Sequence, residues 1–213
     1  MNEKFDYMLK TDVEDFGINY LRGQTSIDAF SGSVRFNEDG GRIEAKTSHL
    51  SLNFTKILEK ELFFDDFSGG ISWRRNEKEI TLLTDSLHFE NNDLRSSFSF
   101  QMTIPSGSDY PLIDMDASWT VNDLSVLKRY LPENMPNQKL KSWLSNLFLS
   151  GRVTHGETHI NGDIRYWPFT NGNGDFYLEA RIEDANVSYS PHWPNPEIRY
   201  MDLIIENSHL FTI

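Results

Sequence analysis

The chain has 213 residues, of which 38% are hydrophobic and 24% are charged. That lean ratio suits a thin sheet with one solvated face better than a thick two-layer globule, so we expect an extended shape. Thirty-two acidic residues against twenty basic ones give a net charge of −12, which argues against a nucleic acid partner because a phosphate backbone would be repelled. The lack of cysteine excludes disulfides, thiolate nucleophiles and cysteine-based zinc sites.

The sequence shows neither a signal peptide at its start nor a membrane span, and both of its ends look cut. The N-terminal segment MNEKFDYMLK lacks the apolar core of a signal peptide, and no stretch approaches the roughly 18 consecutive apolar residues of a membrane span. Residues 201–206 have the pattern of a strand, and residues 210–213 that of a return strand that stops short. We therefore expect an internal piece of a longer protein, which would contact a membrane only through parts missing from this chain.

An internal repeat is the most informative feature of the N-terminal half. The sequence FSGSVRF at residues 30–36 reappears as FSGGISW at residues 67–73, an offset of 37 residues, and the register holds without a gap to about residue 90. A repeat of this length indicates stacked supersecondary units. We therefore expect residues 1–121 to form repeated β-strand units.

Apolar and polar residues alternate within these units, which is the pattern of half-buried strands. The clearest examples are residues 98–104, 113–121 and 176–182. Segments rich in glycine and asparagine separate the strands, as at residues 37–41 and 171–174, and such residues favour tight turns. Adjacent strands should therefore pair as antiparallel hairpins.

Residues 122–150 break the alternation and predict a helical insert. Asn122 or Asp123 can cap a short helix, two prolines interrupt it, and helical spacing resumes over residues 138–148. The apolar face of this second helix should pack on the sheet; its residues are Leu140, Trp143, Leu144, Leu147 and Phe148. Residues 151–213 then form a β-strand unit that continues the same sheet and is truncated at the C-terminus.

His155, Glu157 and His159 form the one spacing that suggests a metal ion. Residues i, i+2 and i+4 of a strand project from the same face, and two imidazoles with a carboxylate can hold zinc or iron. The spacing differs from the helical zincin motif, and the polar face of an exposed strand explains the same residues. We favour that second interpretation and predict no metal site and no cofactor.

No pattern in the sequence points to catalysis. Asp114 and Asp116 alternate with apolar residues, which places them on a solvated sheet face rather than across a cleft, as a glycosidase would need. No nucleophile elbow, phosphate-binding loop or dinucleotide-binding motif follows an expected strand. We therefore predict no catalytic residues and expect that the protein is not an enzyme.

Seven short motifs follow one another in a characteristic order between residues 119 and 213. They are Tyr130-Leu131-Pro132, Trp143-Leu144, Leu149-Ser150-Gly151, Gly162-Asp163-Ile164, Trp167-Pro168-Phe169, Ala185-Asn186-Val187-Ser188-Tyr189 and His192-Trp193-Pro194. This order resembles the AsmA-like proteins of Gram-negative envelopes, specifically the YhdP branch. Residues 30–104 share only the looser strand-repeat character of that family.

Together with the strand pattern, the resemblance implies an all-β fold. The expected architecture is an extended, twisted antiparallel sheet, shaped as a half-pipe or a jelly-roll-like groove, with a short helical insert near residues 123–148. The resemblance also implies the periplasmic portion of an inner-membrane-anchored protein that carries phospholipid between the inner and outer membranes and so supports the outer-membrane permeability barrier. It supplies no catalytic residues.

A groove for phospholipid acyl chains would be lined by the apolar residues of the alternating strands. Because hydrophobic attraction is non-directional, a uniform lining would let a lipid slide. We predict the lining residues to be Val34, Phe36, Ile71, Trp73, Phe98, Phe100, Met115, Trp119, Leu178, Ile182, Val187 and Leu203. The alternative is a non-enzymatic, adhesin-like β-sandwich for interaction or assembly, in which a second sheet covers the same apolar face.

Overall fold

The computed structural model describes residues 7–20, 25–54, 60–108, 110–131, 133, 138–188, 192 and 194–213. Over these ranges thirteen strands form one antiparallel sheet, which confirms the all-β prediction. The strands are β1 (Leu9–Tyr20), β2 (Thr25–Phe36), β3 (Gly40–Thr47), β4 (Leu50–Phe54), β5 (Leu62–Phe64), β6 (Asp66–Arg75), β7 (Glu79–Glu90), β8 (Leu94–Pro105), β9 (Leu112–Val121), β10 (Phe148–Asp163), β11 (Gly174–Val187), β12 (Glu197–Glu206) and β13 (His209–Thr212).

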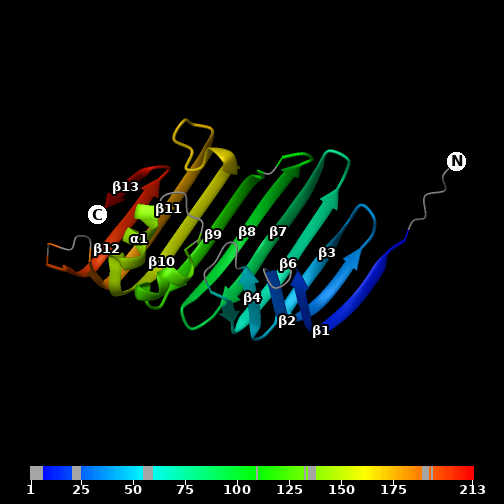
Figure 1. The fold of residues 1–213 in the computed structure, drawn as a ribbon, viewed down its shortest axis with the longest axis horizontal. Coiled ribbons are helices and arrows are strands. Elements are labelled where there is room, and N and C mark those ends of the chain that lie inside the picture. The colour runs from blue at the N-terminus through cyan, green and yellow to red at the C-terminus, as the bar shows by residue number, and fades with distance from the viewer. Residues whose placement is uncertain are drawn as a thin grey trace.

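Apart from the pairs β3–β4 and β5–β6, strands adjacent in sequence are hydrogen-bonded neighbours in the sheet, so the colours of Figure 1 run in order from blue at β1 to red at β13. β3 and β4 both pair with β2, while β6 pairs with β3 and β5 with β4. β3 and β4 are therefore the two halves of one long bent strand. β5 and β6 are the two halves of the next. The repeated FSG segments lie on β2 and β6, with β3 between them, so the 37-residue offset corresponds to one pair of strands.

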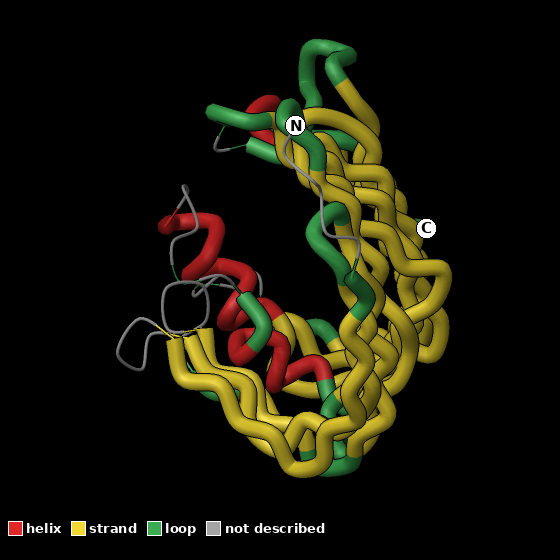
Figure 2. The backbone as a smooth tube through the Cα atoms, turned by 90° about the vertical axis from the view of Figure 1, so that its right-hand side faces the viewer, coloured by secondary structure: helices red, strands yellow, loops and turns green. Residues whose placement is uncertain are grey.

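The sheet curves into an open half-pipe. Figure 2, which looks along the long axis, shows the strands wrapping around a concave side. The pairing register shifts at Val13–Phe16 in β1, at Gly69–Ser72 in β6 and at Val153–Gly156 in β10. Such bulges bend strands and increase their twist. The half-pipe form of the prediction is thus the one observed, and the described residues contain no second sheet of the kind a jelly roll needs.

The predicted helical insert is confirmed and lies on the concave side (Figure 2). It consists of the 3-10 helix η1 (Leu124–Arg129) and the helix α1 (Gln138–Leu147), between β9 and β10. Asp123 caps η1, its side chain accepting a hydrogen bond from the backbone N–H of Ser125. A further 3-10 turn, η2 (Ile164–Tyr166), follows β10. No helix in the described ranges is long and apolar enough to cross a membrane.

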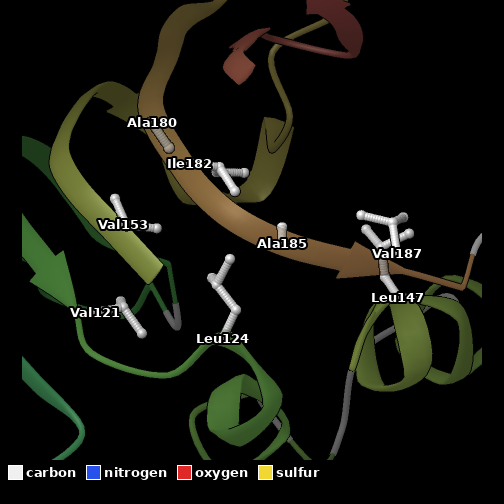
Figure 3. Packing of buried hydrophobic residues seen from close by; sticks show 8 residues of the cluster. All are labelled: Val121, Leu124, Leu147, Val153, Ala180, Ile182, Ala185 and Val187. Carbon is white, nitrogen blue, oxygen red and sulfur yellow. The ribbon is translucent and has the colours of Figure 1, made fainter. Parts of the chain in front are cut away.

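The main core of the molecule lies where the insert meets the sheet. Figure 3 shows Leu124 of η1 and Leu147 of α1 facing apolar side chains of β9, β10 and β11. Leu147 thus packs as predicted for the apolar helix face, and Phe148, which the structure places at the start of β10 instead of in the helix, packs against the same cluster. The side chains of Leu140, Trp143 and Leu144 lie outside the described residues. The insert supplies, over this part of the sheet, the second layer that an apolar sheet face needs. The sheet residues in this cluster are Val121, Val153, Ala180, Ile182, Ala185 and Val187.

Gly69 offers a test of the bend. Its φ is +129°, and a Cβ atom there would collide with the carbonyl oxygen of Ser86 on β7. Gly107 has a φ of +79°, and an added Cβ atom would meet no other atom within 4 Å. We expect Gly69→Ala to lower the free energy of unfolding by about 2–4 kcal/mol and Gly107→Ala by about 1 kcal/mol, measured by urea denaturation. Equal losses would show that the contact with β7 does not constrain the bend.

Candidate functional site

A continuous apolar surface covers the concave side of the sheet. The insert marks this side, because its contacts with Val121, Val153 and Ile182 fix which side chains face the concavity. Cross-strand pairs carry the same face across the sheet. One row joins Trp73, Leu82, Met102 and Ile113, and another joins Leu87, Phe98, Ala117, Thr158, Leu178 and Ile205.

Alternation and register place all twelve predicted lining residues on the concave face. Ten of them are half-buried and keep part of their surface open. Ile182 and Val187 are buried, with 1% and 7% of their surface exposed, because the insert packs over them. The open residues are Val34, Phe36, Ile71, Trp73, Phe98, Phe100, Met115, Trp119, Leu178 and Leu203. Contact with lipid stays a prediction for these residues.

Two tryptophans of this face lie over glycines of the neighbouring strand. Trp73 pairs with Gly41 and Trp119 with Gly156, and a Cβ atom on either glycine would meet the indole ring. The Trp119 indole N–H also donates a hydrogen bond to Thr158 Oγ1 at 3.0 Å. The rings therefore lie along the sheet and extend the apolar surface across the glycines, which leave no side chain of their own.

Phenylalanines add a ladder of ring contacts between β5, β7 and β8. Phe64 meets Phe89 edge-on with ring centroids 5.0 Å apart, and Phe89 meets Phe98 in the same way at 5.7 Å. Phe98 and Phe100 stack at 6.0 Å. These separations are typical of favourable aromatic pairs. The ladder makes the middle of the concave face a fixed aromatic surface.

Polar and charged side chains predominate on the convex face, although a few apolar ones such as Leu83 are exposed there. Arg152 Nη2 lies 2.9 Å from Glu183 Oε2, and this hydrogen bond lowers the pKa of the Glu183 carboxyl. Arg181 is similarly within 3.2 Å of Asp202. Such exposed ion pairs contribute little stability. The two faces of the sheet therefore differ sharply in polarity, as the alternation in the sequence predicts.

The predicted trio of His155, Glu157 and His159 lies on the convex face and separates into two pairs. His155 Nε2 is 3.2 Å from Glu157 Oε1, whereas His159 Nδ1 is 2.8 Å from Asp116 Oδ1 on β9. In the described ranges the group that brings metal-ligand atoms together is Asp114, Asp116 and His159, whose atoms lie within 4.8 Å of one another. Carboxylate and imidazole donors suit a divalent cation, but both aspartates are exposed and exposed acidic groups are common without an ion, so we assign this group no function.

Sequence reasoning missed the Asp114–Asp116–His159 group because it depends on cross-strand register. Asp116 pairs with His159 across β9 and β10, 43 residues apart in sequence. The two residues come together only through the pairing register of β9 and β10, the strands that the insert connects. The alternation within each strand predicts which face of the sheet a residue lies on. It does not predict which residue of the adjacent strand lies beside it.

A polar network ties the insert to the turn between β7 and β8. The Tyr130 hydroxyl donates to Asp93 Oδ2 at 3.0 Å and accepts from Asn91 Nδ2 at 3.0 Å. Arg129 Nη1 lies 2.9 Å from the same Asp93 oxygen, and Asn91 also donates to the carbonyl of Phe63 at 2.8 Å. Burial raises the pKa of Tyr130 to about 12. The network thus fixes the start of the insert against the rim of the half-pipe.

Removal of the Tyr130 hydroxyl should weaken the attachment of the insert. Tyr130→Phe leaves the carboxylate of Asp93 short of one donor, so we expect the free energy of unfolding to fall by about 1–2 kcal/mol in urea denaturation. Tyr200→Phe is the matched control, because it removes an exposed hydroxyl that donates to Asp202 at 2.6 Å; it should cost less than about 0.5 kcal/mol. Equal costs would mean that the network does not hold the insert.

Tyr130 also predicts a pH dependence. The fold favours its neutral phenol, so its stabilising contribution is complete below the ordinary pKa of 10.0 and is lost as the pH rises toward about 12. We expect the midpoint of urea unfolding to fall more steeply over this alkaline range in the parent chain than in Tyr130→Phe. Parallel pH profiles for the two proteins would contradict this assignment.

Comparison with known proteins gives two matches. A family model described as "YhdP protein" matches residues 1–212. The "Intermembrane phospholipid transporter YhdP" of Escherichia coli (strain K12) is 22% identical over 165 residues, which is 78% of this chain and 13% of that protein. The chain therefore spans about an eighth of the length of this relative. No solved structure matches the chain.

Proposed function

The chain belongs to the YhdP family, and from that premise we propose that it forms a segment of a groove along which phospholipid acyl chains pass between the inner and outer membranes. The single observation that carries the proposal is the open apolar face on the concave side of the sheet. Ten of the twelve predicted lining residues keep exposed surface there, although they are apolar. The name of the Escherichia coli relative supplies the class of cargo.

The length of the apolar face supports a conduit rather than a single binding pocket. The thirteen strands occupy eleven positions, because β3 and β4 share one and β5 and β6 share another. At about 4.8 Å between neighbouring strands, eleven positions span roughly 50 Å. One acyl chain spans about 15 Å, half of the roughly 30 Å hydrocarbon core of a bilayer. Several lipids could therefore follow one another along this segment.

Burial of acyl chains is enough to hold lipid in the groove. Each methylene taken out of water contributes about 0.8 kcal/mol, so a whole chain gains on the order of 10 kcal/mol before ordering costs. The attraction has no preferred direction along an apolar wall. Headgroups would remain in water at the open side of the half-pipe. A lipid could then move along the face without breaking specific bonds.

The sandwich alternative requires protein to cover the concave face. In the described part of the chain, η1 and α1 cover it over β9 to β11, Trp167 and Phe169 cover the end of the β10–β11 hairpin, and no second sheet is present. Large apolar side chains elsewhere on that face stay open, as Phe16 does with 45% of its surface exposed. This arrangement favours the groove. Placement in the periplasm, as part of a protein anchored in the inner membrane, follows from the same proposal.

A charged side chain on the concave face should reduce lipid binding. We expect the chain to retain phospholipid through purification, and Phe100→Asp to lower the bound lipid about tenfold, because an unpaired carboxylate would face acyl chains. The measurement is native mass spectrometry after incubation with vesicles of phosphatidylethanolamine and phosphatidylglycerol.

Leu83→Asp is the matched control for this change. Leu83 is an exposed apolar residue whose cross-strand partners are Ser72 and Gln101, so it lies on the convex face. The substitution should leave bound lipid unchanged. Equal lipid losses in the two variants, with both folded by circular dichroism, would oppose a role for the concave face.

A further inference from the structure

A trough runs along the concave face between β1 and β7. One cross-strand row consists of Val13, Gly32, Ala45, Gly69 and Leu87, which pair in that order across β1, β2, β3, β6 and β7. Its three central members have no side chain or only a methyl group. A Cβ atom on Gly32 would collide with the carbonyl oxygen of Glu44, so the lack of a side chain there is set by the closeness of the neighbouring backbone.

Larger side chains, all apolar except that of Thr11, form the two walls of the trough. The row on one side is Thr11, Val34, Ile43 and Ile71, and the other side includes Phe30 and Phe67, which belong to the repeated segments. The cavity that results has a volume of about 370 Å³. Of its fifteen lining residues, Thr11 is the only one with a polar side chain. The cavity therefore suits a hydrocarbon and no ligand that needs hydrogen bonds.

We propose that this trough is a discrete resting site for one acyl chain of a phospholipid, so that the groove is not uniform along its length. The inference rests on the proposed function and adds that one place along the groove holds an acyl chain more strongly than the rest. Hydrophobic attraction grows with the apolar area removed from water. An acyl chain in the trough contacts a floor and two walls, whereas on the open face it contacts one surface.

The dimensions and direction of the trough match a single acyl chain. Five neighbouring strands at about 4.8 Å spacing span about 19 Å, compared with about 15 Å for one chain in a bilayer. The row runs across the strands and hence along the axis of the half-pipe. At Leu87 it continues into Phe98 of β8, so a chain can enter from the adjoining groove without leaving the apolar surface.

A protein helix is a poor occupant for the same space. The flanking rows lie two residues either side of the floor, about 13 Å apart at the backbone before their side chains are counted. A helix with side chains is about 10–12 Å across, so Phe30 and Phe67 leave too little width. Where the chain does place a helix on this face, over β9 to β11, the sheet carries the larger side chains of Val153 and Ile182, which form one core cluster with Leu124 and Leu147 of the insert.

Photocrosslinking tests the site directly. The whole chain is incubated with phosphatidylethanolamine vesicles that contain a small fraction of the same lipid with a diazirine at the end of one acyl chain. After irradiation, adducts are mapped by peptide mass spectrometry. We expect adducts on β2, β3 and β6 to exceed those on the concave residues of β8 and β9 by about fivefold or more.

Ala45→Phe fills the floor of the trough and is the decisive variant. Adducts on β2, β3 and β6 should fall about tenfold, while those on β8 and β9 should persist. Ala117→Phe makes the same change on β9, where Ala117 pairs with Phe98 outside the trough, and it should leave the trough adducts unchanged. If Ala45→Phe does not fold, Ala45→Leu replaces it, and the map of the parent chain remains a test without any variant.

The outcomes separate this inference from the proposed function. Adducts spread evenly over the concave face, or trough adducts that survive in Ala45→Phe, would overturn the resting site and leave a uniform groove. If the concave residues of all the strands carried no adducts, the proposed function would be overturned, and this inference with it. Adducts confined to the convex face would have the same meaning.

Discussion

The structure depends on one constraint: each strand presents an apolar face, and the sheet has almost no second layer to cover it. In most folds such a face is buried against helices or another sheet. Here the insert buries Ile182 to 1% exposure, whereas Ile18, near the other end of the sheet, keeps 48% of its surface open. Curvature and ring packing reduce the exposed apolar area, but they do not remove it. What remains is open in the described part of the chain, and under the proposed function an acyl chain would cover it.

The curvature itself comes from local backbone irregularities. Besides Gly69, positive φ angles occur at Asp15 and Ala29 on β1 and β2 and at Asp184 on β11. A non-glycine residue in this conformation is unfavourable in isolation, so the surrounding ladder must hold it there. Bulges repeated on successive strands turn a sheet into a half-pipe. The trough shares one of these irregularities, because Gly69 belongs both to the bulge in β6 and to the floor row of the trough.

The sequence predicts the faces of the strands better than their neighbours. Alternation over residues 98–104, 113–121 and 176–182 correctly identified β8, β9 and β11, because a single strand carries that signal. The helical insert was also predictable from its spacing and its capping residue, Asp123. The division of one long strand into β3 and β4, and of another into β5 and β6, was not, since it depends on breaks at His49 and at Asp65 that have no strong local signal. The trough was equally hidden, because Gly32, Ala45 and Gly69 become one row only through pairing register.

Phe169 has a packing role that its local sequence does not predict. The aromatic-proline step before it is typical of a corner, and the Trp167–Pro168 bond is cis. Yet Phe169 is 1% exposed, and its ring lies where a Cβ atom on Gly162 or Gly174 would be. The ring therefore closes the end of the β10–β11 hairpin. Glycines on the paired strands make the space, as they do beneath Trp73 and Trp119, so glycine opposite an aromatic ring is a recurring means of packing this sheet.

A groove that moves lipid must hold each acyl chain without trapping it. Because apolar burial is proportional to area, a trough deepens the free-energy well only by the extra contact of its walls. A chain that leaves the trough for Phe98 and the aromatic ladder keeps most of its contact with the floor of the groove, so the step between positions is smaller than the cost of returning to water. The insert has the opposite effect from the trough, because it already covers the apolar surface over β9 to β11 and so reduces the area that an acyl chain can contact. Under the proposed function, a lipid passing that point would have less free wall to contact, so the two halves of the segment would hold lipid with different strength.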